Sequence, residues 1–312
     1  MGREVDVTDR VTWTIADTSI AYASGPTLIS KALGKTRISC HLDNFEATAT
    51  VTIESIPKQD SVIFFQGLRR LQQLRFSTDG NLFICNQSAQ VYRIDPSGRF
   101  ETVLRLPVAD TAVYAITRLA VDAQNRLYVN DLTRNACHRF EWDGKKYARG
   151  TLLATKSIGS KQSIATNSLG QAFITIFGRS IDTGTVARID PDGTEVEFSL
   201  RSLATSIAID SQDNIYVDNR RAKCIDVFRG DGTFIEPISH GSADSVSDIT
   251  IDNQGTLFLA LFHSGRVLVL PKGSRTPTLL PGTFGTLGGI ALDSLDRIYV
   301  SDFGGDRISL IY

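Results

Sequence analysis

The chain has 312 residues, of which 42% are hydrophobic and 21% are charged, a composition typical of a folded globular protein and not of a disordered one. Lysine plus arginine number 33 and aspartate plus glutamate number 34, so the chain has no excess positive charge with which to hold a polyanion. Composition therefore gives no support to nucleic acid as a partner, and no apolar run approaches the roughly 18 residues that a membrane span needs.

The first 55 residues contain short segments that alternate apolar and polar positions and are predicted to be β-strands. The segments read VTWTIADTSIAYAS from Val11, TLISKALGKTRISC from Thr27 and ATATVTI from Ala47. They resemble the group 2 bacterial immunoglobulin-like domain, which implies a short β-sandwich and an extracytoplasmic or cell-surface setting in a bacterium. The strand that normally precedes a segment such as Asp6–Trp13 is missing, so we expect residues 1–55 to be a partial domain: the chain is a fragment, or another chain supplies that edge.

Residues 56–60 (IPKQD) are predicted to be a linker, and the apolar run SVIFF at 61–65 is predicted to be a strand. One sequence motif then recurs, which we call the phrase: a short apolar strand followed by a polar turn and a second strand. Its anchor residues are spaced 41 to 45 residues apart, at Leu74, Leu119, Ile164, Ile207, Ile249 and Ile290. This spacing suits a unit of four short strands and predicts the blades of a β-propeller.

A third strand follows each phrase, and a fourth follows it in the first five units, whereas the sixth unit ends at Tyr312. We expect residues 61–65 to supply the missing strand and close the ring, because closure protects sheet edges. The inner strands also carry a small residue after most anchors, such as Ala120 and Ala208, which lets neighbouring blades approach. Arg75 interrupts this column, which indicates a distortion or a function there.

The units LYVND, IYVDNRRAKCIDVF and IYVSDFGGDRISLI resemble NHL repeats over residues 61–312. The predicted fold class is therefore all-β: a six-bladed β-propeller over 61–312, a linker over 56–60, and a short immunoglobulin-like segment over 1–55.

The cysteines Cys40, Cys85, Cys137 and Cys224 form no CxxC pair, so they are predicted to be buried strand residues and say nothing about the compartment. The turn aspartates, among them Asp122 and Asp210, are interpreted as caps of local backbone amides and not as calcium ligands.

Related six-bladed propellers include enzymes with two kinds of site. In lactonases of the regucalcin and paraoxonase type, Asn or Asp residues before the inner strands hold calcium. Streptogramin lyases use histidines near the channel mouth, but the histidines of this chain share no repeat position and are interpreted as structural: His41, His138, His240 and His263. The positions that match the lactonase ligands contain no carboxylate: Gln72, Thr117, Gln162, Thr205, Ser247 and Gly288. We therefore expect no metal and no cofactor.

The residues just before the anchors are predicted to meet at the channel mouth, where convergent polar groups would bind a ligand. The predicted ligand-binding residues are Gln73, Arg118, Ser163, Ser206 and Asp248. Arg118 and Asp248 belong to blades two and five, so they are expected to face each other across a polar funnel and to orient a ligand of mixed charge. The alternative is that both are solvated or paired with neighbours.

The leading hypothesis is a non-catalytic binding or scaffold module, a monomeric propeller disc that recognises a protein, a glycan or a small molecule at its channel mouth. We expect no nucleic acid partner and no direct membrane insertion. The alternative is a lactonase- or lyase-like hydrolytic enzyme of the six-bladed propeller superfamily. RNA binding, known for some NHL propellers, is disfavoured by the near-zero net charge. The absence of the expected metal and histidine patterns favours the non-catalytic module over the enzyme.

Overall fold

The computed structural model of the protein describes residues 12–24, 27–30, 34–42, 45–53, 61–68, 70–87, 90–106, 116–131, 134–147, 150–153, 155, 159–178 and 183–311. The linker predicted over residues 56–60 lies outside the described residues. One compact unit contains Met1–Gln59, and the other contains Asp60–Ile94 and Phe100–Tyr312.

The smaller unit is built from short antiparallel strands. Its sheet has the order β1-β4-β5, and β2 pairs with β3. The strands are β1 (Thr12–Ile15), β2 (Ala21–Ser24), β3 (Thr27–Ser30), β4 (Gly34–Leu42) and β5 (Phe45–Ile53). Along β4, Thr36 and Ile38 are buried whereas Arg37 is exposed, which is the alternation expected of a strand with one covered face. The resemblance to an immunoglobulin-like domain stays a prediction.

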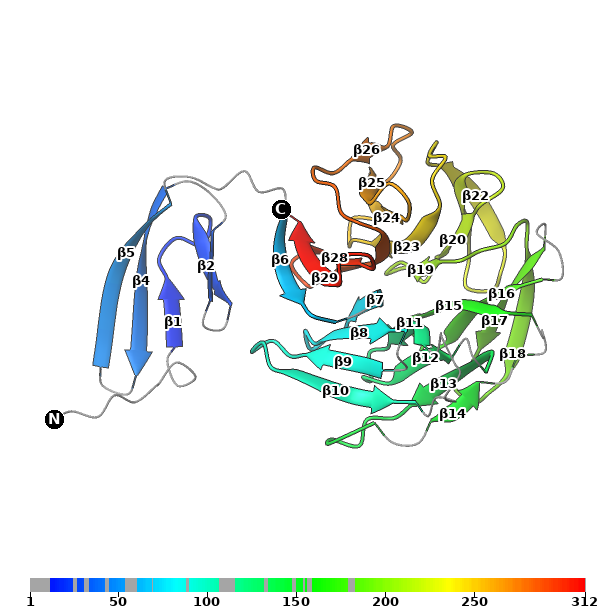
Figure 1. Ribbon diagram of the computed structural model, residues 1–312, viewed down its shortest axis with the longest axis horizontal. Coiled ribbons are helices and arrows are strands. Elements are labelled where there is room, and N and C mark those ends of the chain that lie inside the picture. The colour runs from blue at the N-terminus through cyan, green and yellow to red at the C-terminus, as the bar shows by residue number, and fades with distance from the viewer. Residues whose placement is uncertain are drawn as a thin grey trace. The chain divides into compact units, whose positions relative to one another are not determined.

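The larger unit is a six-bladed β-propeller, as predicted: its described residues form six four-stranded antiparallel sheets around a central axis (Figure 1). Blade one has β7 (Leu71–Phe76), β8 (Leu82–Asn86), β9 (Gln90–Ile94) and β10 (Phe100–Arg105). Blade two has β11 (Ile116–Val121), β12 (Leu127–Asp131), β13 (Ala136–Phe140) and β14 (Thr151–Leu153). Blade three has β15 (Lys161–Thr166), β16 (Ala172–Phe177), β17 (Gly184–Ile189) and β18 (Glu195–Leu200).

Blade four has β19 (Ile207–Ile209), β20 (Ile215–Asn219), β21 (Cys224–Phe228) and β22 (Phe234–Ser239). Blade five has β23 (Val246–Ile251), β24 (Leu257–Leu261), β25 (Arg266–Leu270) and β26 (Thr278–Leu279). Blade six has β27 (Leu287–Leu292), β28 (Ile298–Asp302), β29 (Arg307–Ile311) and β6 (Ser61–Gln66). Within the part of the chain that the structure describes, no helix is long and apolar enough to cross a bilayer.

The ring is closed by the strand ahead of the first repeat. β6 pairs antiparallel with β29, with Phe65 opposite Ile308 and Ser61 opposite Ile311. Figure 1 shows this join, the blue β6 lying beside the red β29. The prediction that residues 61–65 complete the last blade is confirmed.

The hydrophobic core lies between the blades. Each apolar cluster is formed by two neighbouring sheets: Ile84 of blade one packs with Tyr299 of blade six, and Ile225 of blade four with Leu259 of blade five. Because every blade is covered on both faces, the second strands β8, β12, β20 and β24 are buried along their whole length. Burial of both faces explains why each of these strands begins with an apolar run, which in β24 (LFLAL) extends over the whole strand.

The polar turn between the first two strands of a blade is held by a single side chain. In blade two, Asp122 Oδ1 accepts hydrogen bonds from the backbone N–H groups of Gln124 (3.0 Å) and Arg126 (2.9 Å). Asp210, Asp252 and Asp293 make the same pair of bonds, Asn167 does so in blade three, and Ser77 bonds the Asn81 N–H in blade one. The interpretation of these aspartates as backbone caps is confirmed.

Candidate active site

Polar side chains reach the propeller axis from the beginnings of the inner strands. Among the described strands, β7, β11, β15, β23 and β27 each shift register near their first residues. A β-bulge of this kind sets two residues against one and re-aims their side chains. In these five blades the bulge lies at or next to the residue before the anchor.

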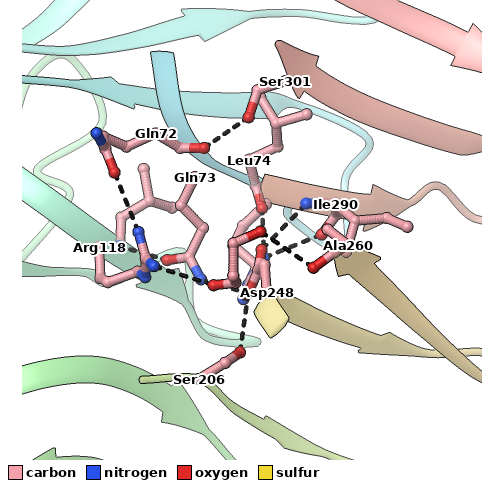
Figure 2. Close-up of polar contacts among 12 residues, drawn as sticks. Gln72, Gln73, Leu74, Arg118, Ser206, Asp248, Ala260, Ile290 and Ser301 are labelled. Carbon is pink, nitrogen blue, oxygen red and sulfur yellow. Dashed lines mark hydrogen bonds and ion pairs between the residues drawn. The ribbon is translucent and has the colours of Figure 1, made fainter. Parts of the chain in front are cut away.

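Asp248 is the centre of a buried polar cluster at the axis, which we call the axial cluster. Its Oδ1 and Oδ2 accept hydrogen bonds from Nη2 and Nη1 of Arg75, both at 2.8 Å. Gln73 Nε2 (2.9 Å), Ser206 Oγ (3.3 Å) and Ile290 N–H (3.1 Å) also donate to this carboxylate, and Figure 2 shows these donors around it. Burial by itself would raise the pKa of Asp248, but Arg75, Arg118 and the Ile290 N–H together outweigh burial and the pKa is lowered. Asp248 is therefore an ionised group whose charge is neutralised inside the protein.

The structure brings together four of the five predicted ligand-binding residues. Gln73 and Ser206 contact Asp248 directly. Arg118 acts on Asp248 through its charge and donates to Gln72 Oε1 (3.2 Å) and the Ser247 carbonyl (3.0 Å). Ser163 lies apart from them: its N–H donates to Thr175 Oγ1 (3.0 Å), and its buried Oγ has no hydrogen-bond partner in the described structure. Gln73, Ser163, Ser206 and Asp248 are all fully buried. The contacts named here are internal to the chain, and a ligand-binding role for the five residues stays a prediction.

Arg75 is the member of the axial cluster that was not among the predicted site residues. It holds the position where blade five places threonine and the remaining blades place alanine, and its guanidinium reaches Asp248 from blade one. The sequence indicated that Arg75 was unusual, because it stands where most inner strands have a small residue. A charged residue at that position does not by itself identify its partner.

A separate cavity of about 120 Å³ opens between blades four and five, and we call it the blade-four cavity. It lies where β20 and β22 end and β21 and β23 begin, which is also the edge at which the inner strands start. Its lining combines carboxylates, cations and a histidine: Asp218, Asn219, Arg220, Lys223, His240, Ala243, Asp244, Ser245 and Val246.

Asp218 is a buried carboxyl group that replaces strand hydrogen bonds at the start of β19. Its Oδ1 accepts from the N–H groups of Thr205 (2.7 Å) and Ser206 (2.8 Å), and its Oδ2 lies 3.0 Å from Thr205 Oγ1. Thr205 Oγ1 is also 3.1 Å from the Val246 carbonyl. A hydroxyl has one hydrogen and cannot donate to both acceptors, so both contacts are satisfied together when Asp218 Oδ2 carries a proton.

The pKa of Asp218 agrees with this geometry. Burial raises it to about 6, although the hydrogen bonds from Ser206 and Thr205 and the charge of Arg220 oppose the rise. A carboxyl group with a pKa near 6 can accept a proton at neutral pH and release it again, which is the property that a general base needs.

His240 is 5% exposed and lines the same cavity. Its Nδ1 accepts a hydrogen bond from the Ser242 N–H (3.2 Å), which assigns the hydrogen of the neutral ring to Nε2. Burial, followed by the charge of Lys223, lowers the pKa of His240, so the ring is neutral at pH 7. Nε2–H forms no hydrogen bond within the described residues and is available as a donor.

Sequence reasoning missed this cavity for two different reasons. Asp218 could have been noticed in the sequence, because the equivalent position of the repeat is neutral in the other five blades: Cys85, Asn130, Thr175, Ala260 and Ser301. His240 had none, since the histidines share no repeat position and the interpretation of all four as structural rested on that fact.

The positions that match the lactonase calcium ligands do not fit a hard cation. They contain no carboxylate, and Gln72, Thr205 and Ser247 use their side-chain oxygens in bonds to other protein groups. At Gly288 there is no side chain, and a Cβ would lie 2.7 Å from the Leu71 carbonyl oxygen. Within the described residues, no three His, Cys, Asp or Glu side chains are grouped so that they could hold a metal ion.

The fold defines the class of protein, and comparison with solved structures shows which propellers it is similar to. A gluconolactonase from Xanthomonas campestris has a TM-score of 0.64 at 18% identity, over 81% of this chain and 90% of the other. A catalytically inactive histidine-to-alanine variant of virginiamycin B lyase from Staphylococcus aureus, solved with quinupristin, has a TM-score of 0.59 at 15% identity, over 96% and 98%.

The PQQ-bound aldose sugar dehydrogenase of Streptomyces coelicolor has a TM-score of 0.62 at 17% identity, over 80% of this chain and 96% of the other. No family model matches the sequence, and no curated protein matches it. At these identities the likeness establishes the propeller fold.

The hypothesis of a non-catalytic binding disc is contradicted by these neighbours, which are named as a lactonase, a lyase and a dehydrogenase. The hypothesis failed because it treated missing family motifs as missing chemistry, whereas one scaffold carries different catalytic groups at different places. The alternative, an enzyme, is the better supported of the two.

Proposed function

We propose that the chain is an enzyme that opens cyclic esters (lactones) by general acid–base chemistry in the blade-four cavity. One observation carries the proposal: a buried neutral histidine and a buried carboxyl group with a pKa near 6 line the same small cavity. Paired titratable groups that burial shifts away from their ordinary pKa values are typical of active sites. The solved neighbour named as a gluconolactonase supports the same reaction class.

His240 would act as an electrophile and Asp218 as a base. Nε2–H of His240 donates to the ester carbonyl oxygen and stabilises the negative charge that develops there during attack. Asp218 takes a proton from the attacking water at Oδ2, where Thr205 Oγ1 already marks a hydrogen-bonding position 3.0 Å away. Water oxygen bonds to the carbonyl carbon, the ring C–O bond breaks, and the released alkoxide takes up the proton, so that a lactone and water give a hydroxy acid.

The test is turnover of a lactone panel, followed by proton release in a pH-stat, with D-glucono-δ-lactone as the first member. His240→Gln and Asp218→Asn are each expected to lower kcat/KM by about 100-fold or more, the usual contribution of a positioned acid or base. Log kcat/KM should rise with pH up to about 6 and then level, because Asp218 acts as a base only when ionised.

The matched control is His263→Gln, since His263 is exposed and outside the cavity and its loss should leave kcat/KM unchanged. Mass spectrometry of the products separates hydrolysis from elimination, because only hydrolysis adds a water. The absence of turnover over the whole panel, or full activity in both cavity variants, would overturn the proposal.

We also infer that the repeats are of the NHL kind and that residues 1–55 are a partial immunoglobulin-like module of an extracytoplasmic bacterial protein. The support is the six recurrent phrases over residues 61–312 and the segments VTWTIADTSIAYAS and ATATVTI, which carry the two resemblances. Fractionation of the producing bacterium tests the location, and recovery of the protein from the cytoplasmic fraction alone would contradict it.

A further inference from the structure

The charges that line the blade-four cavity are not equally available to a ligand. Asp244 accepts hydrogen bonds from the N–H groups of Ser245 (2.7 Å), His263 (3.1 Å) and Ser264 (2.7 Å). Asp218 Oδ1 likewise accepts hydrogen bonds from the N–H groups of Thr205 and Ser206, and its Oδ2 contacts Thr205 Oγ1. Both carboxyl groups are therefore largely engaged by the protein itself.

The two cations of the cavity are far less engaged. Arg220 donates through Nη2 to Ser245 Oγ (3.1 Å), a neutral group. The Lys223 ammonium forms no hydrogen bond and no ion pair within the part of the chain that the structure describes, and its charge acts on His240 across the cavity. The groups of the blade-four cavity that keep unused hydrogen-bonding capacity for a ligand within the described structure are thus its two cations, Arg220 and Lys223.

The backbone at Lys223 provides a second, independent observation. Lys223 precedes β21 and has φ 53°, in the left-handed region that non-glycine residues adopt only at a cost. The same position before the third strand is Asn135 (φ 49°) in blade two, Gly265 (φ 63°) in blade five and Asp306 (φ 51°) in blade six. Asparagine, aspartate and glycine favour this conformation and lysine does not.

The blade-two equivalent shows what a residue at this position does when its role is structural. Asn135 Oδ1 accepts from the Lys161 N–H (2.9 Å), and its Nδ2 donates to the Gly159 carbonyl (3.1 Å), so it ties blade two to blade three. Lys223 makes no such side-chain bond in the described structure. A lysine in a strained position, without a structural bond and lining a cavity, indicates a role in binding.

We propose that the substrate of the blade-four cavity carries a small oxyanionic group, a carboxylate or a phosphate, which Lys223 and Arg220 bind. This inference rests on the proposed function and narrows its substrate to anionic lactones, such as the lactone of a sugar diacid. A cavity of about 120 Å³ admits a group of this size together with part of a ring. The two cations would hold the anion while His240 faces the ester carbonyl.

The experiment measures binding without turnover, by calorimetry and by the NMR shift of the His240 ring, with succinate, inorganic phosphate and the neutral analogue succinamide as probes. Succinate or phosphate should bind and succinamide should not, and comparison of the two anions identifies the group. Lys223→Asn and Arg220→Gln should each weaken anion binding by about tenfold or more, the range for loss of a charge-assisted hydrogen bond.

Lys223→Asn is also a control on folding, because asparagine already holds the equivalent left-handed position in blade two and should not lower the melting temperature. Lys272→Asn, a cation that does not line the cavity, should leave binding unchanged. Equal binding of succinate and succinamide, no binding of either anion, or undiminished binding by Lys223→Asn overturns the inference. Anion binding without hydrolysis of any lactone refutes the proposed reaction alone. Hydrolysis of neutral lactones at a rate that Lys223→Asn does not change refutes the anionic substrate alone.

Discussion

Arg75 of blade one and Asp248 of blade five are joined by two hydrogen bonds of 2.8 Å across the propeller axis. Their side chains are 19% and 0% exposed, so the pair is largely withdrawn from water. Breaking a buried pair by removing one partner leaves an uncompensated charge, which is more costly than the pair itself is stabilising.

Arg75→Ala and Asp248→Ala are therefore each expected to lower the free energy of unfolding by about 3 to 5 kcal/mol. Asp248→Ala should be the worse of the two, since it also leaves Gln73, Ser206 and Ile290 without an acceptor. Urea titration measures the loss. Arg139→Ala, which removes the more exposed pair with Glu141, is the matched control and should cost at most about 1 kcal/mol. A loss of similar small size at Arg75 would contradict the central role of this pair.

Asp218 should make stability fall as pH rises. Its pKa is about 6 in the folded protein and 3.8 ordinarily, so the folded state holds the proton more tightly than the unfolded state. The contribution of Asp218 to the unfolding free energy is then highest below pH 3.8, decreases between pH 3.8 and 6, and levels above 6. The decrease due to this group is about 3 kcal/mol.

The measurement is the difference between the wild type and Asp218→Asn at each pH, because the difference removes the contribution of the other carboxyl groups. As the pH rises from 4 to 7, the unfolding free energy of Asp218→Asn should increase relative to that of the wild type. A gap that stays constant over this range would show that Asp218 titrates normally.

Chelation is expected to change neither stability nor turnover. The positions Gln72, Thr205 and Ser247 are neutral and bonded within the protein, and a native-state ion would otherwise raise stability by linkage. Melting curves before and after dialysis against EDTA test this, with calcium added back as the control. A melting temperature that falls with EDTA and recovers with calcium would refute it.

Ring closure should depend on β6. Deletion of the chain through Ile56 leaves Ser61–Gln66 in place and should leave a folded propeller, whereas deletion through Gln66 exposes the edge of β29. Thermal melts and size-exclusion chromatography compare the two proteins. The longer deletion is expected to unfold or to form oligomers, and equal behaviour of the two would show that closure is dispensable.

The sequence by itself determined the propeller, because every blade repeats the same local pattern of apolar strands and polar turns. The anchors from Leu74 to Ile290 recur at 41 to 45 residues, and turn residues such as Asp122 cap their own backbone over four residues. The closing strand at 61–65 could also be inferred, since a sixth blade one strand short has a single apolar run available to complete it.

Only the tertiary structure decided which polar groups meet. Arg75 and Asp248 are 173 residues apart and come together because the ring brings blades one and five to the same axis. Asp218 and His240 become a candidate pair only when the ends of β20 and β22 border one cavity, and burial there, not residue type, shifts their pKa values. Hydrophobic periodicity specifies which strands form, but the desolvation and pairing of charges depend on contacts between distant repeats, which no single repeat encodes.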